Sequence, residues 1–208
     1  MNNHPNRTTC YHMLETAKTP AHIVGHCKAV AAVAYTIGWE INRARMIQTG
    51  MGCRALNAGA VGGRVINLEL LLSSGLLHDM MRLYDNHASV CASLLNKMGL
   101  IEEAKVVSVH MMKSEFHDLM IADEADILCL ADNLVIESEY VGLDRRTEYV
   151  LDKAIRIGHP ERQPAIRAKK ENLQKLVSQI EHLTGKTMND IMTDIDYENI
   201  EVTLAKRV

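Results

Sequence analysis

Apolar residues recur at helical spacing along most of the chain and predict a series of packed helices. Thr19-Pro20 pairs a capping hydroxyl with a proline, which is typical of a helix start, and the apolar pattern then continues to about residue 45. Residues ~64–78 are almost wholly apolar, as expected of a buried central helix. Five further helices are predicted at about 87–98, 101–113, 121–138, 145–157 and 166–183.

The remaining segments have other patterns. Residues 1 to ~18 are interpreted as a polar lead-in, 50–63 as a glycine-rich loop between helices, and 200–205 as a short strand. The glycine-rich segment lacks the GxxxxGK[ST] pattern of a phosphate-binding loop. We therefore expect an all-α domain over 19–158 and a C-terminal helical extension, 159–208, packed on the same domain.

Composition supports packed helices and limits the classes of partner. Hydrophobic residues make up 47% of the chain, with one Trp, one Phe and four Pro, which favours a globular helical protein over a β-sandwich. The net charge is −3 and no basic surface is evident, so no nucleic-acid partner is expected. The sequence leaves a homodimer open.

The lack of a recognisable signal peptide or membrane span, together with the scattered cysteines, predicts a cytoplasmic protein. The first residues lack the order of a signal peptide, and no apolar run approaches the ~20 residues of a membrane span. The five cysteines are scattered without a CxxC pair, as expected of reduced thiols. Three of them, Cys27, Cys91 and Cys129, fall in apolar helical patterns and are predicted to be buried.

Four ionisable residues stand where apolar residues are expected. His78 and Asp79 close the most hydrophobic helix, Asp132 interrupts ILCLADNLVI, and His26 has Val, Ala and Ile on its neighbouring turns. Each one alone is explained by a hydrogen bond in the core. Together they form a mixed nitrogen and oxygen set that suits Mn, Fe, Co, Ni or Zn, and whose carboxylates also admit Mg.

Other polar residues have simpler explanations. His117-Asp118 is a second His-Asp pair, but it follows the polar KSEF, so solvent exposure accounts for it. His22 shares a helix face with His26 and is interpreted as a surface histidine. Arg145 and Arg146 follow the last predicted ligand, where they either bind phosphate or form salt bridges on a solvated face.

The order His, His-Asp, Asp resembles the HD-domain superfamily of metal-dependent phosphohydrolases. Over about residues 19–157, three segments are similar to those of the family: TPAHIVGHCKAVAAVAYTIGWEIN, LLSSGLLHDMMR and ADNLVIESEYVGLDRRTEYV. The resemblance implies an HD-domain helical bundle in which one metal ion is bound by His26, His78, Asp79 and Asp132.

A second metal ion is implied by the bimetallic branch of this superfamily, whose two additional histidines lie between the HD pair and the last Asp. His87 in DNHASVCASLL and His110 in KVVSVHMM are similar to those positions. Asp79 would then bridge two ions. The alternative is that both are ordinary helix residues and the centre holds one ion.

Three departures from common family patterns bear on the substrate. Arg82 stands where a Lys often follows the HD pair, and it retains the ability to bind phosphate. Asn133 replaces the Lys that often follows the final Asp, which removes one candidate cation. The paired His-His-Glu and the Gly-Tyr-Pro signature of cyclic dinucleotide phosphodiesterases are absent, which argues against that activity.

The resemblance therefore predicts a metal-dependent phosphohydrolase acting on a phosphomonoester or phosphodiester of a nucleotide or another small metabolite. The metal would lower the pKa of a bound water and polarise the phosphoryl oxygen. Asp79 and Arg82 are the predicted catalytic residues. Two alternatives remain open: a mixed-valence di-iron oxygenase with the same ligand set, and a non-catalytic metal-binding module.

Overall fold

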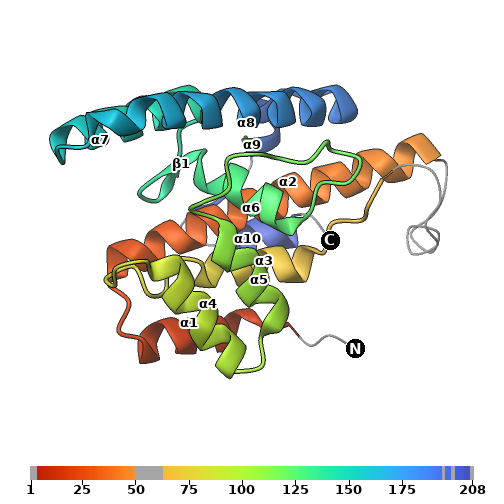
Figure 1. Cartoon of the computed structure of the whole chain (residues 1–208). Coiled ribbons are helices and arrows are strands. Elements are labelled where there is room, and N and C mark those ends of the chain that lie inside the picture. Colours follow the sequence, from red (N-terminus) through yellow and green to blue (C-terminus); the bar gives the residue numbers. More distant parts are fainter. Residues whose placement is uncertain (1–3, 50–62, 194, 198–199, 207–208) are drawn as a thin grey trace.

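The structure is a computed structural model that describes residues 4–49, 63–193, 195–197 and 200–206, and its described part is a bundle of helices with one short hairpin (Figure 1). The predicted glycine-rich loop and Cys53 lie outside the described residues, apart from Gly63. The helices and strands are α1 (Arg7–Thr16), α2 (Ala21–Thr49), α3 (Leu68–Leu77), α4 (His87–Lys97), α5 (Ile101–Val109), α6 (Glu124–Asp132), β1 (Val135–Ile136), β2 (Glu139–Tyr140), α7 (Leu143–Arg156), α8 (Gln163–Thr184), α9 (Met188–Met192) and α10 (Ile200–Ala205), with a 3₁₀ turn at Pro160–Arg162.

The all-α fold class predicted from the sequence is confirmed. No described helix is long and apolar enough to cross a membrane.

The long helix α2 is the centre of the bundle, and α3 packs closely against it. Gly75 makes this approach possible, because a Cβ atom there would lie 2.6 Å from the Cα atom of Ala31. Asn67 begins α3 by accepting hydrogen bonds from the backbone N–H groups of Glu69 and Leu70. The approach to α2 at Gly75 thus fixes the position of the C-terminal half of α3.

Helices α7 and α8 form a layer along one side of the molecule, with β1, α6 and α9 between this layer and the helices α3, α4 and α5 (Figure 1). Four apolar residues of α8 join the core cluster that contains α2 and α6: Leu173, Leu176, Val177 and Ile180. The predicted extension thus shares a core with the preceding helices. The predicted boundary at residue 158 stays a prediction.

Two expectations for the chain ends are wrong. The expected polar lead-in forms α1, whose Cys10, Met13 and Leu14 are buried at i, i+3 and i+4 spacing. The expected strand 200–205 is helix α10. There Ile200 and Leu204 pack in the core at i, i+4 spacing. The same short segment also alternates between apolar and polar side chains, which is why the sequence suggests a strand.

Several predicted helix boundaries also require correction. The helix expected to start at Thr19 begins at Ala21 and continues to Thr49, and the Thr19 hydroxyl donates to the Met80 carbonyl instead of capping. Residues 64–67 precede α3, and α5 ends at Val109 instead of 113. The helix expected over 121–138 is α6, which ends at Asp132; the apolar pattern continues into the hairpin and conceals this end.

Candidate metal centre

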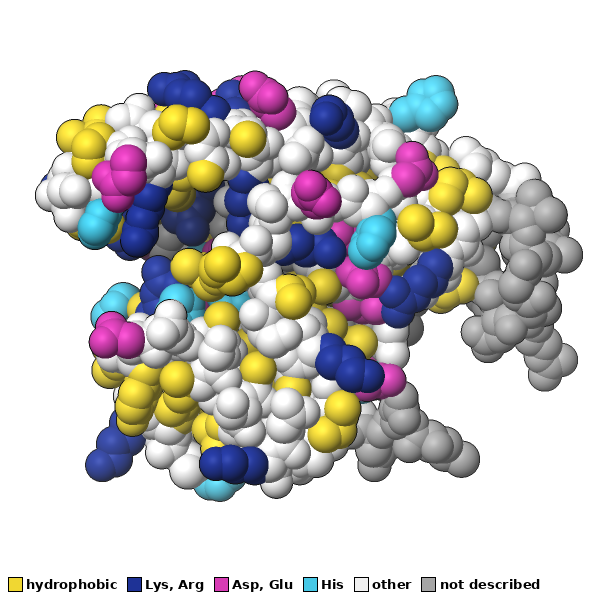
Figure 2. Space-filling view, in the orientation of Figure 1, with side chains coloured by type: hydrophobic (Ala, Val, Ile, Leu, Met, Phe, Trp, Pro, Cys, Tyr) yellow, Lys and Arg dark blue, Asp and Glu magenta, His cyan; other side chains and the backbone are white. Residues whose placement is uncertain are grey.

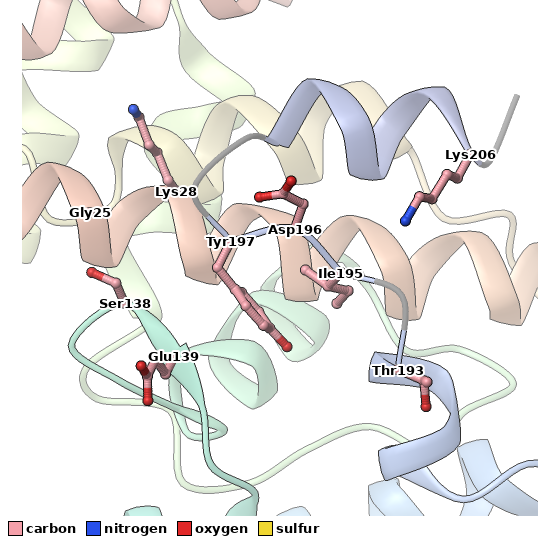
Figure 3. A pocket seen from close by; sticks show the side chains of 9 residues that line it. All are labelled: Gly25, Lys28, Ser138, Glu139, Thr193, Ile195, Asp196, Tyr197 and Lys206. Atoms are coloured by element: carbon pink, nitrogen blue, oxygen red, sulfur yellow. The ribbon is translucent and has the colours of Figure 1, made fainter.

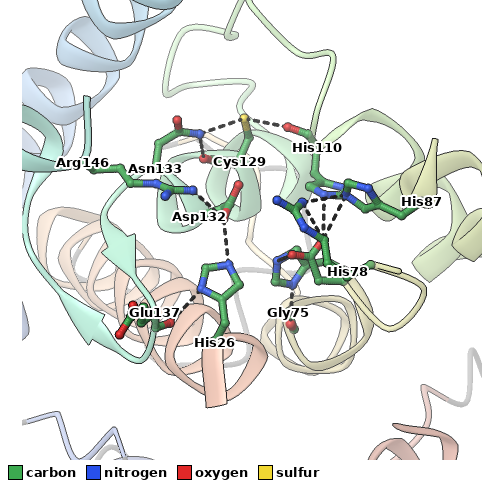
Figure 4. Close-up of polar contacts among 12 residues, drawn as sticks. His26, Gly75, His78, His87, His110, Cys129, Asp132, Asn133, Glu137 and Arg146 are labelled. Atoms are coloured by element: carbon green, nitrogen blue, oxygen red, sulfur yellow. Dashed lines mark hydrogen bonds and ion pairs between the residues drawn. The ribbon is translucent and has the colours of Figure 1, made fainter. Parts of the chain in front are cut away.

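The structure brings together the six residues predicted as metal ligands, and each of them is positioned by a helix (Figure 4). Five lie at helix termini, where side chains converge more easily than along helix faces. They are His26 within α2, His78 and Asp79 directly after α3, His87 at the start of α4, His110 directly after α5, and Asp132 at the end of α6.

Backbone carbonyls orient two of the buried histidines. His78 Nδ1 lies 2.8 Å from the carbonyl oxygen of Gly75, and His110 Nδ1 lies 2.7 Å from that of Val107. A carbonyl oxygen only accepts hydrogen bonds, so in both rings Nδ1 carries the proton. Nε2 is therefore the nitrogen with a free lone pair, and this is the usual arrangement of a metal-binding histidine.

His26 is oriented in the same way from the hairpin. Its Nδ1 donates to the Glu137 carbonyl at 2.8 Å, and its Nε2 lies 3.1 Å from Asp132 Oδ1. A neutral imidazole with the proton on Nδ1 directs a lone pair at the carboxylate, so a proton or a metal ion has to lie between the two atoms. Burial lowers the pKa of His26, but the hydrogen bond and charge of Asp132 outweigh burial and raise it above its ordinary value.

Asp79 lies at the centre of the cluster. Its Oδ1 is 3.1 Å from His87 Nε2, 3.7 Å from His110 Nε2 and 3.4 Å from Arg82 NH1, and its Oδ2 is 3.8 Å from His78 Nε2. Burial alone would raise the pKa of Asp79, but the surrounding imidazoles and Arg82 hold it well below its usual range. Asp79 is consequently an ionised carboxylate at the centre of these imidazoles and Arg82.

The protonation states of the buried groups suit a metal ion. Burial lowers the pKa of His78 to about 4, so its Nε2 lone pair is available at neutral pH. Burial would raise the pKa of Asp132, but the hydrogen bond from His26 and the charge of Arg146 hold it well below its usual range. His78 and the two carboxylates are thus in the forms that metals need, whereas His26, whose pKa is raised, would release its proton when it binds a metal ion.

Arg82 contacts one of the predicted ligands of the second metal ion. Its NH1 donates to His87 Nε2 at 2.9 Å, and arginine has no acceptor, so this nitrogen of His87 also carries a lone pair. A second metal ion bound by His87 would need the same lone pair. Arg82 would then have to move away from His87.

The donor set fits one divalent metal ion and is also compatible with two. Buried Nε2 atoms of His78 and His110 have no hydrogen-bond partner, which is costly unless something else binds them. Donor atoms of His26, His78 and Asp79 lie within 4.8 Å of one another, and so do those of Asp79, His87 and His110. Asp79 is common to both groups.

A third cluster of donors lies elsewhere, and its contacts explain it without a metal. Donor atoms of His117, Asp123 and Asp126 also lie within 4.8 Å. Asp126, however, forms the capping box of α6 with Asp123 and already pairs with Lys113 at 3.0 Å and with His117 at 2.8 Å. His117 is half exposed and Asp118 is exposed, as predicted from the polar sequence before them.

The other polar residues singled out in the sequence lie outside the cluster or at its edge. His22 and Arg145 are exposed, whereas Arg146 lies with NH2 3.7 Å from Asp132 Oδ1. The three cysteines predicted to be buried are buried, and burial raises the pKa of Cys129 to about 11. These thiols are therefore protonated at neutral pH and are unsuited to act as nucleophiles.

Comparison with known proteins agrees with this geometry. The chain matches the HD domain family over residues 23–136, which is more than half of its length and spans His26 to Asp132. It belongs to the HD-domain family. No curated protein and no solved structure matches the chain. HD-domain proteins are generally metal-dependent hydrolases, so the family supports a metal-binding role for the His/Asp cluster.

A separate cavity of about 670 Å³ lies beside the hairpin (Figure 3). Its walls come from α2, from the hairpin and from the C-terminal segment, and include Lys28, Glu139 and Asp196. None of the six predicted ligands lines this cavity. The metal centre and this cavity are thus different places, although residues of α2 and of the hairpin contribute to both.

Proposed function

We propose that this HD-domain protein is a metal-dependent phosphohydrolase that cleaves a phosphate ester of a nucleotide or another small metabolite. The observation that carries the proposal is the position of Arg82. Its guanidinium lies 3.4 Å from Asp79, at the edge of the His/Asp cluster, and its side chain is about one third exposed. A fixed cation that is open to solvent beside a metal-binding cluster suits a phosphoryl group.

The metal-binding residues under this proposal are His26, His78, Asp79 and Asp132, with His87 and His110 binding a second ion. The bound metal would supply an activated water and polarise the phosphoryl oxygen. Asp79 lies at the centre of the predicted ligands, so it is the carboxylate proposed to accept the proton of the attacking water. Arg82 would bind the phosphoryl oxygens and offset the negative charge that grows on them.

Phosphate release is the experiment that tests the proposal. The purified full chain is incubated with phosphomonoesters, nucleotides and phosphodiesters in the presence of Mn, Co, Ni, Zn, Fe or Mg, without oxygen. We expect metal-dependent release of phosphate or of a phosphomonoester. The Asp79→Ala variant is the control, because it lacks the central carboxylate and should release none.

The same donor set also suits a di-iron centre, so an oxygenase is the second candidate function. An oxygenase needs iron, a reductant and oxygen, and Mn or Mg would not support it. If no phosphorylated compound is cleaved with any metal, and the iron form consumes oxygen with an organic substrate, the hydrolase proposal is wrong. If neither occurs, the protein is a non-catalytic metal-binding module.

A further inference from the structure

Positive charge gathers beside the metal centre on the side of α7 and α8. Lys and Arg side chains lie inside the hollow between this helical layer and the rest of the molecule (Figure 2). Two cations of this layer lie toward α6, near its end at Asp132. Arg146 comes from the first turns of α7, and Lys169 comes from α8.

Arg146 is largely buried but poorly paired. Its side chain is 18% exposed, its NH2 lies 3.7 Å from Asp132 Oδ1, and its Nε is buried without a hydrogen-bond partner. The ring of Tyr149 packs against it, with 5.6 Å between the guanidinium carbon and the ring centroid. Because a guanidinium has five N–H donors and stays charged, Arg146 retains donors for an anion.

Lys169 is the second cation on this side of the metal centre. It is half-buried, its charge lowers the pKa of the Cys129 thiol against the larger effect of burial, and no carboxylate pairs with it among the described residues. The next residue, Lys170, differs, because it pairs with Asp144 at 2.5 Å. Lys169 is therefore the member of this pair whose charge remains available.

Both cations lie toward α6: Arg146 is beside Asp132, and Lys169 is near enough to lower the pKa of the Cys129 thiol. Cys129 and Asp132 are three residues apart on α6 and so share a face. The thiol of Cys129 also donates to the carbonyl oxygen of His110, at 3.4 Å, which places this face against the metal centre. The carboxylate nearest to Arg146 is Asp132, and it already pairs with His26. Positive charge thus exceeds negative charge at this position.

We propose that Arg146 and Lys169 form a second anion-binding subsite beside the metal centre, and that the substrate carries a second phosphoryl group that binds there. Anion binding at this subsite does not depend on which reaction the metal centre catalyses. The claim about the substrate rests on the proposed phosphohydrolase function. Arg82 would then bind the phosphoryl group that is cleaved, and the cations of α7 and α8 would bind the one that is retained.

Inorganic phosphate is the first probe. The ¹⁵N-labelled full chain, dialysed against a chelator, is titrated with phosphate, and the arginine Nε–Hε signals are followed by NMR. We expect the signal that is missing from the Arg146→Lys variant to shift and saturate. Arg146→Gln and Lys169→Gln should each weaken this binding by about tenfold, the effect of losing one charged hydrogen bond.

The neighbouring cations give matched controls. Arg145→Gln and Lys170→Gln remove one positive charge each from the same helices and should leave phosphate binding unchanged. Thermal unfolding of every variant separates loss of binding from loss of fold. The subsite is disproved if the chelated wild type shows no saturable shift, or if the control variants weaken binding as much as the Arg146 and Lys169 variants do.

Hydrolysis tests the second half of the proposal. Pairs of mono- and bisphosphorylated sugars with different spacings between phosphoryl groups are compared as substrates. At least one bisphosphate should have a KM about tenfold below its monophosphate, and Arg146→Gln should abolish this difference. Equal KM values in every pair overturn the claim about the substrate. Saturable phosphate binding without any ester hydrolysis would keep the subsite and reject the phosphohydrolase function.

Discussion

The imidazole of His78 is held by Gly75, whose carbonyl oxygen accepts its Nδ1–H at 2.8 Å. The same glycine allows α3 to lie against Ala31 of α2. One residue thus sets both the spacing of two helices and the direction of a predicted ligand. The packing of α2 on α3 and the geometry of the metal centre are therefore coupled.

Gly75→Ala should lower the free energy of unfolding by about 1–3 kcal/mol, because the new Cβ would collide with the backbone of Ala31. It should also weaken metal binding, since His78 moves with α3. Gly38→Ala is the matched control: its Cβ would meet only the ends of side chains, the nearest being Leu71 Cδ1 at 2.7 Å. Urea unfolding and metal titration measure both effects, and equal loss of metal in the two variants would contradict the coupling.

Removal of the central carboxylate tests the assignment of the metal centre. Asp79→Ala should abolish most metal binding, because Asp79 is common to both groups of donors. The double variant His117→Ala/Asp118→Ala should keep its metal, since the buried partner of His117, Asp126, is already neutralised by Lys113. Elemental analysis of purified protein gives the answer. Full occupancy in Asp79→Ala, or loss of metal in the double variant, would mean that the wrong pair has been chosen.

A second metal ion would make a separate, measurable contribution. His87→Ala and His110→Ala should each lower the metal-to-protein ratio by about one ion while the first ion remains. Arg82 donates to His87 Nε2, so Arg82→Ala should raise the affinity for the second ion by removing a competitor. Wild-type stoichiometry in both histidine variants would indicate a mononuclear centre.

The clustering of the predicted ligands could be predicted from the sequence because misplaced polarity is a local signal. His26 and Asp132 stand out against apolar neighbours, and the structure brings them to 3.1 Å across 106 residues. The supporting residues carry no such signal. The carbonyl of Glu137 that orients His26 belongs to the backbone, and a backbone contact across the fold leaves no mark in the side-chain pattern.

Elements of the fold were missed for a related reason. The hairpin after α6 continues an apolar run, and α10 is too short for its period to be recognised. Lys169 looks like one more surface lysine of an amphipathic helix. Its difference from Lys170 lies in the position of Asp144, which only the folded structure reveals.

A buried ion pair between α2 and the C-terminal region gives a pH-dependent prediction. Glu40 is 3% exposed and accepts from Lys186 Nζ at 2.7 Å and from Arg43 NH2 at 2.9 Å. Burial would raise the pKa of Glu40, but these two cations lower it below its usual value. The folded state therefore gains stability above the unfolded pKa, and this gain is lost as the pH falls through the folded pKa.

Glu40→Gln should accordingly reduce the free energy of unfolding by about 1–3 kcal/mol at pH 7, and by progressively less below pH ~4.5. Glu171→Gln, at an exposed carboxylate of α8, should change little at any pH. The free energy of unfolding is measured with urea between about pH 3 and pH 7, because carboxylates titrate in the lower part of this range. A destabilisation by Glu40→Gln that is independent of pH would contradict the proposed ion-pair contribution.

Arg82 gives the prediction that bears most directly on reaction class. Its NH1 approaches both Asp79 at 3.4 Å and His87 at 2.9 Å, so the guanidinium is fixed beside the metal-binding atoms without being one of them. Arg82→Ala should reduce kcat/KM for phosphorylated substrates by at least about tenfold while metal content is retained. Arg82→Lys should recover part of the activity, because it keeps the charge but not the planar pair of donors.

Lys97→Ala, at an exposed cation of α4, is the control for a general loss of positive charge. Phosphate release measured without oxygen, beside elemental analysis, separates the cases: unchanged kcat/KM in Arg82→Ala would remove the main support for a phosphohydrolase, whereas loss of metal would make Arg82 a structural part of the centre.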